Sequence, residues 1–180
     1  NPTAGSFEVC ERNQRHFATL TCVMPGRSDL MTIYNSILEG HLENAGFNST
    51  IQASGISARV AEATISLHEA VSYRFLPSAT KFVYNWNMRE LSNIYQGLTL
   101  SDGEYFARCV DLVKLWQHEC RRVFSDRMIS ESENARFEET MAEVVKKVFD
   151  AKKDFDGGQV RLKRKTQGQV QHILLYAFEW

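Results

Sequence analysis

Apolar residues recur at helical spacing in five separate stretches of the chain: 28–46, 57–75, 87–98, 102–127 and 134–150. In each stretch they fall three or four residues apart, which places them on one face of an α-helix. Such an apolar stripe is stable only when another element covers it. The pattern therefore predicts a mainly α fold, built as a small helical bundle.

The best-defined helix start lies at Asn87. Glu90, three residues later, completes the Asn-x-x-Glu form of a capping box, and Gly97 offers a place for the helix to end. Arg89 is unusual there, because a cation in the first turn opposes the helix dipole at a cost of about 0.3–1 kcal/mol. A phosphate could reverse that cost, since free backbone N–H groups and a guanidinium both bind it. Taken alone, however, a first-turn arginine is more often a solvated surface residue.

A stretch near the N-terminus has a different pattern. Between His16 and Pro25, β-branched and apolar residues occupy both faces and predict a buried strand that Pro25 ends. A single strand is not stable alone, so its partner strands would lie outside this chain. Arg15 stands immediately before the strand and Arg12 three residues earlier, where a rigid sheet could aim a charge outward. The simpler interpretation is that both are charged residues flanking a strand.

The segments between and after these elements are polar or rich in turn residues. Residues 46–55 are predicted to be a polar connection. Near the C-terminus, the Asp-Gly-Gly sequence at 156–158 indicates a turn, and RLKRK at 161–165 forms a basic patch. Such a patch is usually a solvated or ion-paired face. The last segment is predicted to be a strand or a helix.

The bulk composition excludes several classes of function. The 180 residues are 43% hydrophobic and 24% charged, with a formal net charge of −1. These values are ordinary for a globular protein and predict neither nucleic acid nor a membrane surface as partner. No apolar run approaches the roughly 18 residues that span a bilayer. The four cysteines form no CxxC pair, which favours reduced, intracellular thiols.

The sequence contains none of the usual catalytic signatures: GxxxxGK[ST], GxGxxG, GxSxG or HExxH. The five histidines are dispersed, and none has a second ligand at metal-binding spacing on one helix face. We therefore expect no metal site and assign the histidines structural or surface roles. His118 and Glu119 are expected to be an exposed pair rather than an acid–base couple.

Five segments, in this order and spacing, strongly resemble a dynein heavy chain: NPTAGSF, RNQRHF with the stretch after it, PGRSDLMTIYNSILEGHL, LPSATKFVYNWNMRELSNIYQGL and LVKLWQHECRRVFSDRM. The resemblance runs over about residues 1–150 and is greatest to the third ATPase-ring module of an axonemal, outer-arm-type chain. It implies a helical AAA+ lid subdomain joined to the last strand of the preceding α/β P-loop core. The implied division is 1–25 for the end of the core, 26–150 for the lid and 151–180 for a connector towards the next module.

The resemblance also implies roles for particular residues. Asn1 matches the sensor I position near the γ-phosphate and the attacking water. Arg15 matches the arginine finger that reaches the nucleotide of the neighbouring module, with Arg12 as the alternative. Arg89 matches sensor II, which touches the γ-phosphate of its own module's nucleotide. Both Walker motifs would lie upstream of Asn1, so the isolated chain is expected neither to bind ATP tightly nor to hydrolyse it.

The implied function is that of a piece of a motor. The parent ring would use ATP/ADP with Mg²⁺ and drive minus-end-directed movement on microtubules, in the cytoplasmic cytoskeleton of a cilium or flagellum axoneme. Its partners would be neighbouring AAA+ modules, the microtubule, and dynein intermediate and light chains. The alternative is a stand-alone helical interaction or scaffold domain whose arginines are only surface charge.

Overall fold

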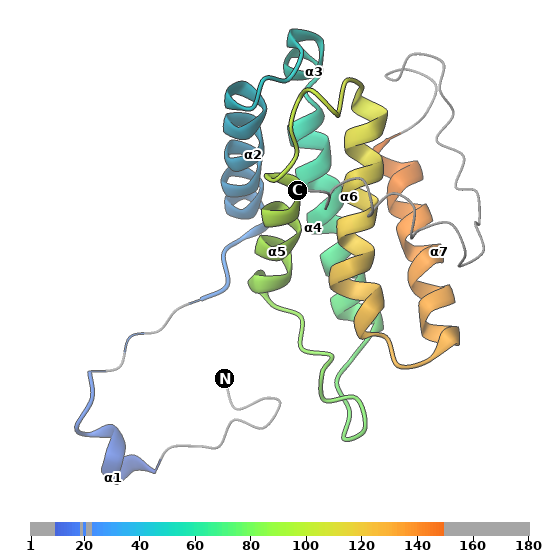
Figure 1. Cartoon of the computed structure of the whole chain (residues 1–180). Helices are drawn as coiled ribbons and strands as arrows, with labels where there is room; N and C mark the ends of the chain where they lie inside the picture. The colour runs from blue at the N-terminus through green and yellow to red at the C-terminus, as the bar shows by residue number, and fades with distance from the viewer. Residues whose placement is uncertain (1–9, 19, 21–22, 150–180) are drawn as a thin grey trace, which may run out of the picture.

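The structure is a computed structural model that describes residues 10–18, 20 and 23–149. Over these residues the regular elements are all helical (Figure 1). In chain order they are α1 (Glu11–Gln14), α2 (Arg27–Asn44), α3 (Ser49–Ala53), α4 (Ile56–Arg74), α5 (Met88–Leu98), α6 (Cys109–Phe124), the 3-10 helix η1 (Ser125–Arg127) and α7 (Glu131–Val148). The mainly α prediction is confirmed.

Helix α4 lies at the centre of the bundle. It packs against α2 on one side and α7 on the other, and also contacts α5 and α6 (Figure 1). Its stripe of Val60, Leu67 and Val71 is completely buried. The predicted apolar stripe of this segment is therefore the one that the bundle covers.

Large aromatic side chains fill the core between α4, α6 and α7. Trp116, Phe124 and Phe137 are fully buried. The Trp116 indole Nε1 donates a hydrogen bond to Thr64 Oγ1 at 2.8 Å, which satisfies the one polar atom of this large side chain. Sequence periodicity placed these residues on inward faces, and the structure confirms that placement.

Several predicted boundaries and faces differ from the structure. Ile33 and Ile37 of α2 are 43% and 44% exposed, because the covered stripe of that helix is narrower than the apolar pattern. The connection at 46–55 contains α3, which Asn48 caps and which buries Ile51. Helix α6 begins only at Cys109 instead of residue 102, since a turn occupies the residues before it.

The prediction of a strand between His16 and Pro25 is wrong for the residues that the structure describes. Residues 16–18, 20 and 23–25 are not in a strand, whereas 19, 21 and 22 lie outside the described residues. Phe17, Leu20 and Val23 are 73%, 88% and 82% exposed, so neither face of this stretch is covered. A strand needs a neighbour to accept its backbone hydrogen bonds, and no strand is present in the described part of the chain.

The segment NPTAGSF, the tail 151–180 and its basic patch lie outside the described residues. Among the helices that are described, none combines the length and apolar character needed to cross a membrane.

Candidate functional site

The candidate site begins at the N-terminus of α5, where the predicted capping box is confirmed. The Asn87 side-chain Oδ1 accepts a hydrogen bond from the Arg89 backbone N–H at 2.8 Å. In return, Glu90 Oε2 accepts from the Asn87 backbone N–H at 2.7 Å. Two of the N–H groups that a helix start leaves unpaired are thereby satisfied, and the first turn is held in one conformation.

Gly97 does not end this helix. Helix α5 continues to Leu98, and Gly97 lies where α5 crosses α6. A Cβ atom at Gly97 would lie 2.0 Å from Glu119 Oε2 of α6. A larger residue there would have to displace the Glu119 side chain, so the glycine serves the close approach of the two helices rather than termination.

Arg89 is exposed at the start of α5. Within residues 10–18, 20 and 23–149 its guanidinium has no hydrogen-bond or ion-pair partner, although its backbone N–H is held by Asn87. A cation at the positive end of a helix that pairs with no carboxylate is electrostatically unfavourable. Its position is thus suited to an anion supplied from outside the bundle.

Glu90, the next residue, is almost completely buried, with only 2% of its surface exposed. Its Oε1 pairs with Arg127 Nη1 at 2.8 Å. Arg127 belongs to η1, which directly follows α6, and its guanidinium carbon lies 5.5 Å from the centre of the Trp86 ring. The ion pair and the cation–π contact together fasten the start of α5 to the end of α6.

These residues surround an open groove at one end of the bundle. The groove is lined by Phe82, Val83, Asn85, Asn87, Arg89, Glu90 and Arg127. Its charged lining consists of Arg89 of α5 and the ion pair of Arg127 with Glu90, so the unpaired charge is that of Arg89. Phe82 and Val83, which are 71% and 41% exposed, supply an apolar part. Such a lining fits a ligand that carries both a negative charge and an apolar surface.

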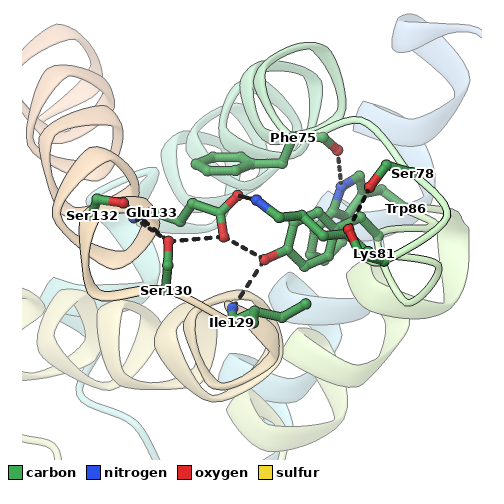
Figure 2. Close-up of polar contacts among 10 residues, drawn as sticks. Phe75, Ser78, Lys81, Trp86, Ile129, Ser130, Ser132 and Glu133 are labelled. Carbon is green, nitrogen blue, oxygen red and sulfur yellow. Dashed lines mark hydrogen bonds and ion pairs between the residues drawn. The ribbon is translucent and has the colours of Figure 1, made fainter.

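The connection between α4 and α5 supports the groove through a polar network around Glu133 (Figure 2). Lys81 Nζ pairs with Glu133 Oε1 at 2.6 Å, and the Tyr84 hydroxyl donates to Glu133 Oε2 at 2.8 Å. The Ile129 backbone N–H donates to the Tyr84 oxygen at 3.0 Å. The connection is therefore tied to the start of α7.

Trp86 is held by a hydrogen bond, because its Nε1 donates to the Phe75 carbonyl at 2.8 Å (Figure 2). This hydrogen bond joins the end of α4 to the residue just before the α5 cap. The aromatic ring beneath Arg127 is thus held at its indole nitrogen as well as by packing.

The same network shifts the acidities of its members. The hydrogen bond from Lys81 lowers the pKa of Glu133, and those from Tyr84 and Ser130 lower it further. The hydrogen bond to Glu133 raises the pKa of Lys81. Burial raises the pKa of the Tyr84 hydroxyl. Around neutral pH, Lys81 and Glu133 are consequently an ion pair and Tyr84 is a neutral donor.

The other predicted site residues are not brought to this groove. Arg15 follows the short helix α1, is exposed, and donates from Nε to His16 Nε2 at 3.3 Å. Arg12 is also exposed, and α1 buries none of its residues and stands apart from the bundle (Figure 1). Asn1 lies outside the described residues. The expected sheet edge that would aim Arg15 is absent from the described residues.

The histidine assignments need one correction. His118 has a side chain that is 42% exposed, but Glu119 is buried and pairs with Arg122 Nη2 at 2.7 Å. Glu119 is therefore not part of an exposed pair, because the close packing of α5 on α6 covers it. His68 is also buried, which lowers its pKa. In the described part of the chain, no cluster of three or more His, Cys, Asp or Glu residues is arranged to hold a metal ion.

Sequence reasoning missed Arg127 as a site residue. It sits in the segment VFSDRM after an amphipathic helix, where periodicity treats it as one more charged position. Its contact with Glu90 spans 37 positions of sequence, so no local pattern indicates it. Only the tertiary structure shows that Glu90 is buried and that its second carboxylate oxygen needs a further partner.

The chain matches the sequence model of the AAA+ lid domain over residues 60–156. It therefore belongs to the AAA+ lid domain family. The matched region contains α5, α6, α7 and most of α4, so the groove around Arg89 is formed by family residues.

The curated relatives are dynein heavy chains, which confirms the resemblance expected from the sequence. The chain is 44% identical to "Dynein beta chain, ciliary" of Tripneustes gratilla and 45% identical to "Dynein beta chain, flagellar outer arm" of Chlamydomonas reinhardtii. It is 42% identical to "Dynein axonemal heavy chain 17" of Homo sapiens. Each match covers 150 residues, 83% of this chain but only 3% of the relative.

Proposed function

We propose that this chain is part of a dynein motor ring and that Arg89 is its sensor II, contacting the γ-phosphate of nucleotide bound to its own module. The observation that carries the proposal is the exposed Arg89 guanidinium at the capped start of α5, without a carboxylate partner in the described chain. A triphosphate would supply the missing negative charge. Phosphoryl transfer depends mostly on positioning and on charge stabilisation, which a guanidinium on a movable lid can provide.

The proposal extends to the N-terminal residues. Arg15 would be the arginine finger acting on the neighbouring module, with Arg12 as the alternative, and Asn1 would be sensor I. An arginine finger can contribute about 10³–10⁵ in rate. The resemblance in sequence supports these roles. Arg12 and Arg15 are also exposed, which leaves both side chains accessible to a neighbouring module.

The division of the chain is proposed on the same basis: 1–25 as the end of an α/β core, 26–150 as the lid and 151–180 as a connector. With a core and a lid as separate bodies, the nucleotide state can set the angle between them. The ring position, the third module, also rests on the resemblance.

The parent protein would use ATP/ADP with Mg²⁺ to drive minus-end-directed movement on microtubules in the axoneme of a cilium or flagellum. Its partners would be the adjoining AAA+ modules and dynein intermediate and light chains. The names of the relatives, with their ciliary, flagellar and axonemal heavy chains, support this proposal. The family match disfavours the stand-alone scaffold alternative.

The test is microtubule-stimulated ATPase activity of the parent heavy chain carrying Arg89→Ala. We expect the activity to fall about tenfold or more, which corresponds to one lost hydrogen bond between charged groups. Arg136→Ala is the matched control, because Arg136 is an exposed arginine on α7 outside the groove. Equal activity of both variants and the unmodified chain would refute the sensor II assignment.

A further inference from the structure

The buried carboxylate of Glu90 connects two features that are separate in sequence. Its two oxygens have different partners: Oε2 accepts from the Asn87 backbone N–H, and Oε1 binds Arg127. The capping box of α5 and the ion pair to η1 therefore share one side chain. Arg127 and the first turn of α5 therefore contact the same carboxylate.

Arg127 is itself restrained on two sides. Its side chain is 35% exposed and its guanidinium lies over the Trp86 ring. Trp86 is held by the Phe75 carbonyl, so the ring provides a fixed surface. The planar guanidinium is suited to stacking and hydrogen bonding together, whereas an ammonium group would retain mainly the charge.

We propose that Arg127 is a positioning residue for Arg89, acting through Glu90. This inference rests on the proposed function of Arg89. Arg127 holds the Glu90 carboxylate in the capping box, the capping box fixes the first turn of α5, and that turn carries Arg89. The angle at which Arg89 faces the groove is thereby set by η1, at the end of α6.

The physical reason is the cost of an unpaired buried charge. Without Arg127, the Glu90 carboxylate would be buried with only the Asn87 N–H as partner, which is strongly unfavourable. Turning Glu90 towards water removes that cost but releases the Asn87 N–H. The first turn of α5 would then open more often than the rest of the helix.

The first experiment measures amide hydrogen exchange in the 180-residue chain with Arg127→Gln. We expect exchange of the Asn87 and Arg89 amides to accelerate by about tenfold or more relative to the Thr99 amide at the other end of α5. Arg121→Gln is the matched control, because it removes the bidentate pair of Arg121 with Glu138 and leaves the capping box intact. A similar change at Asn87 and Arg89 in both variants overturns the inference.

The second experiment is a double-mutant cycle on the ATPase activity of the parent heavy chain. If Arg127 acts through Arg89, Arg127→Gln lowers the activity of the unmodified chain but has no further effect once Arg89→Ala is present. Arg127→Lys, which keeps the charge near Glu90, is expected to recover part of the activity.

The outcomes of the cycle distinguish the two proposals. Independent, additive effects of Arg127→Gln and Arg89→Ala overturn the positioning role and leave the sensor II assignment in place. A silent Arg89→Ala refutes the sensor II assignment and, with it, the functional consequence proposed for Arg127.

Discussion

Glu133 shows how one side chain can gather several separate segments. Its carboxylate accepts from Lys81 and Tyr84 in the α4–α5 connection and from the Ser130 hydroxyl at 3.2 Å. Ser130 is also the N-cap of α7, since its Oγ accepts from the Glu133 backbone N–H at 3.3 Å. The start of α7 is therefore coupled to the segment that supports the groove.

This cluster is expected to stabilise the fold at neutral pH and to lose that contribution in acid. The folded pKa of Glu133 is lowered from its ordinary value of 4.5, chiefly by the Lys81 hydrogen bond. A carboxylate with a lowered folded pKa stabilises the protein fully above its unfolded pKa and loses that contribution as the pH falls through the folded pKa. We expect the free energy of unfolding to fall more steeply below pH 4.5 in the unmodified chain than in Glu133→Gln. Urea titrations at several pH values test this, and parallel pH curves would contradict it.

Gly103 is a second single residue whose contact no sequence pattern indicates. Its backbone N–H donates to the Ala45 carbonyl at 3.0 Å, which joins the α5–α6 connection to the end of α2. A Cβ at this position would lie 2.3 Å from the Gly46 carbonyl oxygen, and backbone atoms cannot move aside as a flexible side chain can. Only glycine fits without displacing one of the two segments.

At the scale of helices, the packing of α5 on α6 depends on a small residue, Gly97, where the two helices cross. Glu119 of α6 lies against Gly97 of α5 and is held there by Arg122. Arg122 also donates to the Asn93 carbonyl of α5 at 3.1 Å. The two helices are therefore joined by polar contacts as well as by their apolar stripes.

This crossing predicts opposite effects for two glycine substitutions in helices. Gly97→Ala forces Glu119 away and is expected to destabilise the fold by about 1–3 kcal/mol. Gly40→Ala in α2 meets no atom within 4 Å, so it is expected to stabilise by about 0.5–1 kcal/mol through the lower entropy of the unfolded chain. Chemical denaturation of the two variants tests the pair. Stabilisation by both would show that Glu119 yields without cost.

For the whole molecule, the groove at the start of α5 is open and contains only part of what a nucleotide site needs. The 180-residue sequence has no GxxxxGK[ST] motif to surround the phosphates with backbone N–H groups. Arg89 offers an unpaired charge, but Arg127 is already paired with Glu90, and the open groove does not enclose a ligand.

We therefore expect the purified 180-residue chain to show neither tight ATP binding nor ATP hydrolysis. Isothermal titration calorimetry and a phosphate-release assay at high protein concentration measure the two properties. Turnover by the purified chain that Arg89→Ala abolishes would contradict the prediction.

The sequence predicted most of the helical architecture because helix formation depends on spacing that is local. The stripes of α4, α5, α6 and α7 and the capping box at Asn87 and Glu90 were all visible in the order of residues. The sequence also located Arg89 as an exposed candidate at a helix start. The strand near Phe17 was predicted wrongly for the described residues, because strand propensity cannot supply the neighbouring strand that pairing requires.

By itself, then, the sequence determined the long helices, most of their inward faces and the kinship with dynein heavy chains. Only the tertiary structure decided that Glu90 is buried, that Arg127 pairs with it, and that Gly97 and Gly103 lie at close contacts. The physical reason is distance along the chain. A helix is specified by residues three and four apart, whereas these contacts join segments whose meeting depends on how the whole bundle packs.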